Sequence, residues 1–196
     1  MTQTMKDAAA TTPRFAPLDL DAMAPEQRAA AQALIDGPRG GIRGPFHALL
    51  RKPGLADRVR MLGDSVRFES SLPAQLRELA IVVTARFWSA RYEWHAHSRL
   101  AMELGVARTA IDAIGRGRQP QGLTPDQALV YEVVREVLVA KDISDGTYQA
   151  ALERWGEATL IELLATVAYF GFVSVILNAV RYPVPAGGEE LPQVDS

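Results

Sequence analysis

Glu93 and His97 are the two residues of this sequence whose types and spacing best suit proton transfer. They are four positions apart, so on a helix their side chains stack on one face and can share a proton. The same spacing is common on exposed helix faces, where such a pair adds only about a few tenths of a kcal/mol. His95 lies roughly on the opposite side. The run EWHAH therefore does not match a metal motif, which needs two histidines four positions apart.

Glu78 is a carboxylate in the middle of an apolar segment, ELAIVVTARFW. A buried carboxylate without a partner costs several kcal/mol, so a partner is expected. Arg77, Arg86 or Arg91 would make a purely structural ion pair. His97 would instead make Glu78 part of a proton relay, because a carboxylate beside an imidazole sets its tautomer and its pKa.

The elements that must position these residues are all predicted to be helices. Residues 76–104 predict two helices with a bend or break near Ser89. Thr124 and Gln127 match a capping box at the start of a later helix, and residues 142–145 turn the chain into another helix near Tyr148. Other expected first-turn prolines and helix-ending glycines are Pro25, Pro53, Pro73, Pro125, Gly37, Gly105 and Gly156. No strand pattern competes, so the fold class is all-α.

A run of eighteen residues without a charge, 163–180, is close to the minimum length for a membrane span. Glu162 and Arg181 bound it tightly, and polar residues recur inside it. We therefore expect a buried core helix of a single domain. Asn178 within this run needs a hydrogen-bond partner, and a tie between helices is the expected role.

Composition excludes several classes of protein. The chain of 196 residues has a net charge of -2, which argues against nucleic acid or a membrane surface as a partner. It has no cysteine, so disulfides, thiolate metal sites and thiol redox chemistry are absent. The N-terminus has no secretory signal pattern, and we expect a cytoplasmic protein. Residues 1–20 are interpreted as an arm, 21–182 as the helical domain and 183–196 as a flexible tail.

The sequence resembles the carboxymuconolactone decarboxylase family, which includes the alkyl hydroperoxide reductase D (AhpD) peroxidases. The resemblance covers about residues 44–183, through GPFHALLRKPGLADRV, LPAQLRELAIVVTARFW, YEWHAH and VSVILNAVRYP. It implies an AhpD-like helical bundle that forms a trimer or a hexamer. The peroxidase branch has two cysteines at positions that fall here on Ala90 and Glu93, so peroxidase activity is not expected. Glu78 and His97 match its glutamate and histidine.

The resemblance implies a decarboxylase, another lyase or an isomerase that acts on a small carboxylated lactone or on a compound of the aromatic-catabolism type, and that needs no cofactor. His97 would exchange the proton, Glu78 would orient it, and Glu93 would complete the relay or contact the substrate. Arg91 or Arg86 would bind the substrate carboxylate, since a guanidinium offers two parallel hydrogen bonds. Further candidate substrate contacts are His47, Tyr92 and Trp88.

Several alternatives stay open from sequence. His47 is also consistent with a solvated loop residue, and Trp88 and Trp94 with core or interface residues. A metal enzyme would use Glu78, Glu93, His97 and His47 as ligands, although no second histidine is paired at helical spacing. A non-catalytic binding or assembly protein would keep the fold without the chemistry. Convergence of Glu78, Glu93 and His97 on one enclosed cavity would favour an enzyme.

Overall fold

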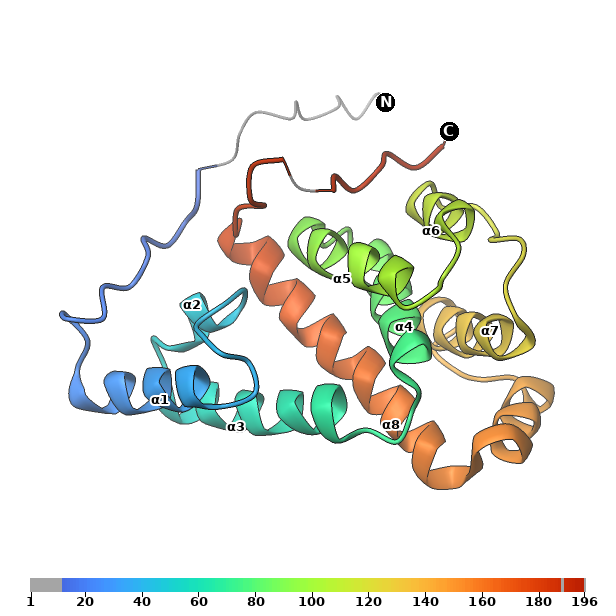
Figure 1. Ribbon diagram of the computed structural model, residues 1–196, viewed down its shortest axis with the longest axis horizontal. Helices are drawn as coiled ribbons and strands as arrows, with labels where there is room; N and C mark the ends of the chain where they lie inside the picture. The colour runs from blue at the N-terminus through green and yellow to red at the C-terminus, as the bar shows by residue number, and fades with distance from the viewer. Residues whose placement is uncertain (1–11, 188, 196) are drawn as a thin grey trace.

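The computed structural model describes residues 12–187 and 189–195, and every regular element in this part of the chain is helical (Figure 1). The prediction of an all-α fold is confirmed. The elements are α1 (Pro25–Asp36), α2 (Phe46–Leu49), α3 (Pro53–Asp64), the π-helical turn η1 (Ser65–Glu69), α4 (Ala74–Phe87), α5 (Arg91–Glu103), α6 (Arg108–Gly115), α7 (Pro125–Val139) and α8 (Asp145–Val180).

The helix α4 lies at the centre of the molecule because its middle part, residues 79–85, is apolar except for Thr84. It packs against α5, α7 and α8, and every residue from Leu79 to Ala85 is buried. One apolar cluster joins α4 with α5, α6, α7 and α8. A second cluster includes Ile81 from the other face of α4, together with α1, α2, α3 and the C-terminal half of α8. Figure 1 shows α8 running diagonally between these two groups of helices.

The long helix α8 is a core helix interrupted at Gly156. Gly156 has φ 76° and ψ 170°, so the sequence prediction of a helix stop corresponds to a break inside α8. By length and composition alone α8 could cross a membrane, but 56% of its 18-residue apolar stretch is buried inside the domain. This burial agrees with the expected core helix. Asn178 donates from Nδ2 to the carbonyl of Trp88 at 2.7 Å, which confirms the expected tie between elements.

The turn between α4 and α5 forms at the predicted break. The helix α4 ends at Phe87, Ser89 has φ 50°, and α5 starts at Arg91. Reversal of the chain here places α5 against α4. The predicted capping box also forms, since the amide of Gln127 donates to the Thr124 hydroxyl and the Gln127 side chain accepts from the Thr124 amide. Trp94 is 2% exposed, as expected for a core residue.

Both ends of the described chain contact the helical domain. Arg14 donates to the carbonyl oxygens of Ala179 and Val180 at the end of α8. In the C-terminal segment, the Glu189 amide donates to His95 Nδ1 and the Asp195 amide donates to the carbonyl of Arg116. The division into an arm, a domain and a flexible tail stays a prediction, and the first eleven residues of the expected arm lie outside the described residues.

Candidate functional site

His97 lies between two carboxylates inside the protein. Its Nδ1 is 2.5 Å from Oε2 of Glu78, and its Nε2 is 3.3 Å from Oε2 of Glu93. The three residues are only 4–5% exposed. Each ring nitrogen therefore faces a carboxylate oxygen, and the three side chains form one continuous path for a proton.

The local sequence explains why these three residues meet. Glu93 and His97 are one turn apart on α5, and Glu78 lies on α4, which the turn at Ser89 brings alongside. Phe170 on α8 packs edge-on against the imidazole, with ring centroids 5.0 Å apart. Of the candidate partners that the sequence suggested for Glu78, His97 is the one that contacts it in the structure. Arg77 instead donates to the carbonyl of Leu72.

The two carboxylates favour a charged imidazole. Burial alone would lower the pKa of His97, but the hydrogen bonds and charges of Glu78 and Glu93 outweigh it, and the net effect raises that pKa. Burial likewise acts to raise the pKa of Glu78. The hydrogen bond and charge of His97, with help from Arg67 and Arg77, bring that pKa below its usual range. We therefore describe the Glu78–His97 pair as a carboxylate bound to an imidazolium.

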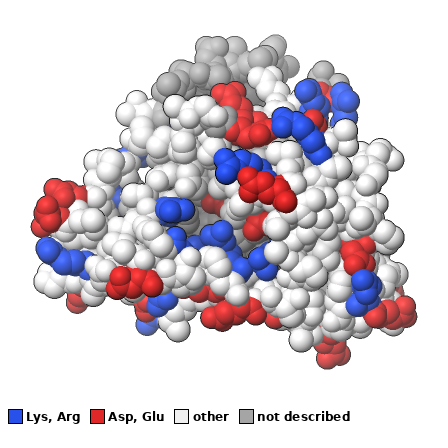
Figure 2. Space-filling model, in the orientation of Figure 1, with Lys and Arg blue, Asp and Glu red and all other residues white. Residues whose placement is uncertain are grey.

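A cavity of about 130 Å³ opens onto this group. Glu93 and His97 line it from α5, and the other walls come from the loop before α2, from η1 and from α8. A hollow on the face shown in Figure 2 is edged by Lys and Arg side chains with acidic atoms close by. The remaining lining residues are Arg39, Arg43, Gly44, Pro45, Arg67, Tyr92, Tyr169, Phe170 and Val173.

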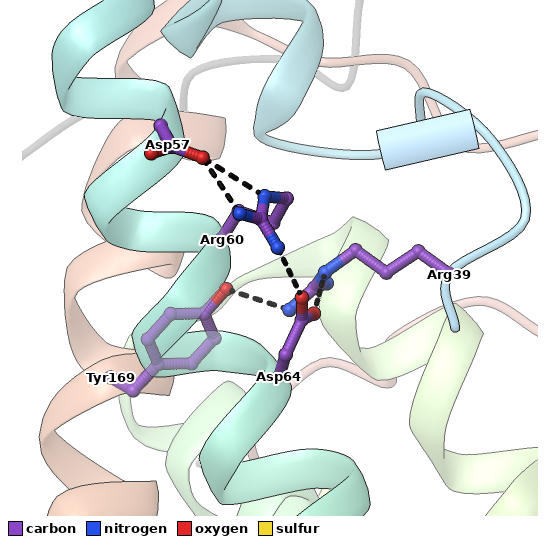
Figure 3. Close-up of polar contacts among 5 residues, drawn as sticks. All are labelled: Arg39, Asp57, Arg60, Asp64 and Tyr169. Atoms are coloured by element: carbon purple, nitrogen blue, oxygen red, sulfur yellow. Dashed lines mark hydrogen bonds and ion pairs between the residues drawn. The ribbon is translucent and has the colours of Figure 1, made fainter. Parts of the chain in front are cut away.

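A polar network fixes one wall of this cavity (Figure 3). Arg39 donates from Nε to Asp64 at 2.8 Å and from Nη2 to the Tyr169 hydroxyl at 3.4 Å. Arg60 bridges Asp64 and Asp57, at 3.1 Å and 2.7 Å. The Arg39 and Asp64 side chains are each 10% exposed, so this ion pair is well shielded from water. Arg39 is thereby held in one orientation beside the cavity.

Gly63 makes the approach of Arg39 to Tyr169 possible. A Cβ atom at this position would overlap both the Arg39 guanidinium and the Tyr169 hydroxyl. Gly44 has a similar role on the loop before α2: it has φ +55°, and its Cβ would lie 2.9 Å from the Tyr92 ring. Both glycines therefore allow close packing of the cavity wall.

Tyr92 is the member of the predicted substrate-binding set that lines the cavity. The other four lie elsewhere. Arg86 donates to the carbonyls of Gly115 and Pro192, and so holds the C-terminal segment. Arg91 is exposed at the first residue of α5, Trp88 is 39% exposed at the turn before it, and His47 lines a separate cavity under residues 13–17.

The metal alternative does not fit this geometry. Both ring nitrogens of His97 already face carboxylates, and His47 lies in a different cavity. Within residues 12–187 and 189–195, no group of three or more histidine, aspartate and glutamate side chains has an arrangement that could hold a metal ion.

Sequence reasoning missed the arginines of the cavity wall. Arg39 and Arg43 come from the glycine-rich loop PRGGIRGP, and Arg67 comes from η1. The first two carried a signal, because charged side chains in a loop with several glycines are often held by a ligand or by neighbouring elements. Arg67 carried none, since a π-helical turn has no reliable sequence pattern.

Comparison with known proteins gives one family match and several solved structures of the same fold. Residues 53–136 match the carboxymuconolactone decarboxylase family. Peroxidase-related proteins from Ralstonia eutropha JMP134, described as having an alkylhydroperoxidase AhpD core, and from Silicibacter sp. TM1040 are each 15% identical, with TM-scores of 0.71 and 0.70. The first match covers 91% of this chain and 95% of that one, and the second covers 93% and 98%.

A third solved structure with this fold is the debrominase Bmp8 in complex with a tribromopyrrole. It is 16% identical, has a TM-score of 0.64, and the match covers 87% of this chain and 90% of that one. At such identities the likeness shows the fold alone. The comparison with curated proteins found no match. This chain therefore has an AhpD-like fold, matches the carboxymuconolactone decarboxylase family over residues 53–136, and contains no cysteine.

Proposed function

We propose that this protein is a cofactor-independent acid/base enzyme, a lyase or isomerase, that acts on a small anionic compound such as a carboxylated lactone. The observation that carries the proposal is the placement of His97 between Glu78 and Glu93, with Glu93 and His97 open to one cavity. Decarboxylation or isomerisation of such a lactone requires a proton to move and negative charge to be stabilised on a carbonyl group.

Each residue of the group has a distinct role in this proposal. Glu93 or His97, which both line the cavity, exchanges the proton with a substrate carbon. The proton passes between Glu93 and His97 Nε2 over 3.3 Å. Glu78 is 2.5 Å from Nδ1 and does not line the cavity, so it orients the ring and balances the imidazolium charge. The arginines of the wall stabilise negative charge that develops on the substrate.

Thiol peroxidase chemistry is disfavoured by the sequence. A peroxidase of this fold needs a thiolate to attack the peroxide, and the chain has no cysteine. Ala90 and Glu93 occupy the positions where the resemblance places the two cysteines. Glu93 thus puts a carboxylate in place of a sulfur atom, next to the imidazole.

Turnover experiments test the proposal directly. Unsaturated lactone carboxylates are incubated with the protein in heavy water, and proton NMR follows deuterium exchange, double-bond migration and loss of carboxylate. The variant His97→Ala should lower the rate by about a hundredfold to ten-thousandfold. Glu78→Gln should be nearly as harmful, and the double variant only slightly worse than His97→Ala, because residues that act as one unit are not additive.

His95→Ala is the matched control for these variants. Its imidazole contacts the Glu189 amide outside the cavity, so activity should stay near that of the unchanged protein. Full activity in His97→Ala would contradict the proposed mechanism. Absence of exchange and turnover with every lactone would favour the alternative, a binding or assembly protein that has kept the fold without the chemistry.

We further propose that the protein is a cytoplasmic homo-oligomer, a trimer or a hexamer, whose other partner is its small-molecule substrate. Exposed apolar side chains on α8 and at the turn before α5 support the self-association. Phe172 is 41% exposed, Val175 48%, Phe87 42% and Trp88 39%. An apolar patch on the surface, when its side chains are contiguous, is typical of an interface.

A further inference from the structure

A second hollow, of about 200 Å³, lies next to the cavity of His97. The two share Arg39, Arg43 and Arg67 in their walls. The rest of the second hollow is lined by uncharged residues, namely Pro38, Gly41, Phe46 and Phe68. These three arginines therefore stand between a hollow without acidic side chains and a cavity that contains the acid/base group.

The three arginines differ in how their charge is balanced. Arg39 is paired with Asp64 and is fixed. Arg43 and Arg67 make no side-chain hydrogen bond or ion pair within the described part of the chain. The Arg67 guanidinium lies 5.1 Å from the centre of the Phe68 ring. Burial and the nearby charge of Arg39 lower the pKa of Arg67, so this guanidinium is poorly solvated and close to a like charge.

Among the residues that line the two hollows and the ionic partners of those residues, the formal charges leave one positive charge in excess. Glu78 and Glu93 together outweigh the imidazolium of His97 by one negative charge, and Arg67 cancels it. Arg39 and Arg60 are balanced by Asp64 and Asp57. The charge of Arg43 remains, and this exposed residue lines both hollows. A ligand with a single anionic group would bring the site to neutrality, whereas a second anionic group would exceed it.

We infer that Arg43 and Arg67 bind one carboxylate of a monoanionic ligand, whose uncharged remainder extends toward Glu93 and His97. A guanidinium matches a carboxylate through two parallel hydrogen bonds, which gives orientation as well as affinity. Arg39 closes the wall behind this carboxylate and is prevented by Asp64 from turning away. The inference rests on the proposed function only for the reacting end of the ligand, since the binding of the carboxylate needs no turnover.

Calorimetric binding of γ-butyrolactone-γ-carboxylate tests this inference. Its methyl ester has nearly the same shape without the charge and should bind about tenfold more weakly or worse. Arg43→Gln and Arg67→Gln should each weaken binding of the acid by about tenfold or more and leave the weak binding of the ester unchanged. Raising the salt concentration should weaken binding of the acid in the unchanged protein.

Arg58→Gln is the matched control, because Arg58 is an exposed residue of α3 that donates only to the carbonyl of Gly54. It carries the same change of charge and should bind the acid like the unchanged protein. If Arg67→Gln fails to fold, Arg43→Gln still tests the inference, because Arg43 is exposed and its replacement should not disturb the fold. Circular dichroism of each variant verifies the helix content.

Four results would overturn the inference: no binding of the acid, equal binding of acid and ester, an equal loss in Arg58→Gln, or tighter binding of an otherwise matched lactone dicarboxylate. His97→Gln separates this inference from the proposed function. If this variant binds the acid through Arg43 and Arg67 while no lactone is ever turned over, the proposed enzyme activity fails and the carboxylate site stands. If turnover occurs but the arginine variants bind the acid normally, the carboxylate site fails alone.

Discussion

Glu78→Gln should measurably destabilise the fold, because it removes the charge from a buried pair and keeps its shape. Glu78 and His97 lie 2.5 Å apart and are 4–5% exposed. Hydrogen bonds to a charged group contribute about 1.5–3 kcal/mol to stability, against about 0.5–1.5 kcal/mol for neutral ones. The amide keeps a hydrogen bond to the ring, so we expect the free energy of unfolding to fall by about 1–2 kcal/mol. Glu78→Ala should cost about 3–5 kcal/mol, since it leaves the imidazole without a partner.

The contribution of the Glu78–His97 pair to stability should depend on pH, because the two pKa values shift in opposite directions. The pKa of His97 is raised in the folded protein, so its stabilising effect is complete below the ordinary value of 6.5 and disappears as the pH rises through the raised value. The pKa of Glu78 is lowered, so its effect is complete above the ordinary value of 4.5 and disappears as the pH falls through the lowered value. The pair therefore contributes fully between pH 4.5 and 6.5, progressively less from these ordinary values toward the two shifted pKa values, and nothing further beyond them.

Urea unfolding followed by circular dichroism across this pH range measures the effect. Glu93→Gln should cost less than Glu78→Gln at each pH, because Glu93 lies 3.3 Å from the ring. Glu103→Gln is a control on α5, since its pair with Arg99 is exposed and is expected to contribute at most about 1 kcal/mol. The reasoning is refuted if the cost of Glu78→Gln does not shrink at alkaline pH, or if Glu93→Gln costs more.

Three further predictions concern the cavity wall, the assembly and the chemistry. Gly63→Ala should destabilise the protein in thermal unfolding, despite the better helix propensity of alanine, because the new Cβ would displace Arg39 or Tyr169; an unchanged or higher Tm would contradict this. Light scattering should give a mass several times the 21.4 kDa of one chain, and a dilute monomer would refute self-association. Metal-free protein should not turn over hydroperoxides with a thiol reductant, and robust turnover would show that cysteine is not needed.

The fold and the acid/base group were predictable because their signals are local. Apolar periodicity and the prolines and glycines fixed the start and end of most helices, and the break at Ser89 put α4 beside α5. Glu93 and His97 are one helical turn apart, and Glu78 is a lone carboxylate in the helix immediately before them. A charged side chain in an apolar segment needs a partner, and the adjacent helix α5 provides His97 as the partner of Glu78.

The binding residues were less predictable because they depend on contacts between distant segments. Arg86 has the charge to bind a carboxylate ligand, but its guanidinium instead donates a hydrogen bond to the carbonyl of Pro192, 106 positions away in the C-terminal segment. His47 stacks on Tyr182, with ring centroids 5.5 Å apart, in a separate cavity. Arg67 reaches the site of His97 from a π-helical turn. Each of these outcomes is decided by tertiary packing, which sequence spacing within one helix does not report.

The cavity residues come from stretches of the chain that differ in whether they match the carboxymuconolactone decarboxylase family. The acid/base group comes from one helical hairpin, residues 74–103, which lies within the family match of 53–136. Arg39 and Arg43 come from a loop that precedes that match. The third arginine of the wall, Arg67, lies in η1, inside the family match. Exchange of the loop 37–45 alone would therefore replace two of the three arginines of the cavity wall and retain Arg67 together with Glu78, Glu93 and His97.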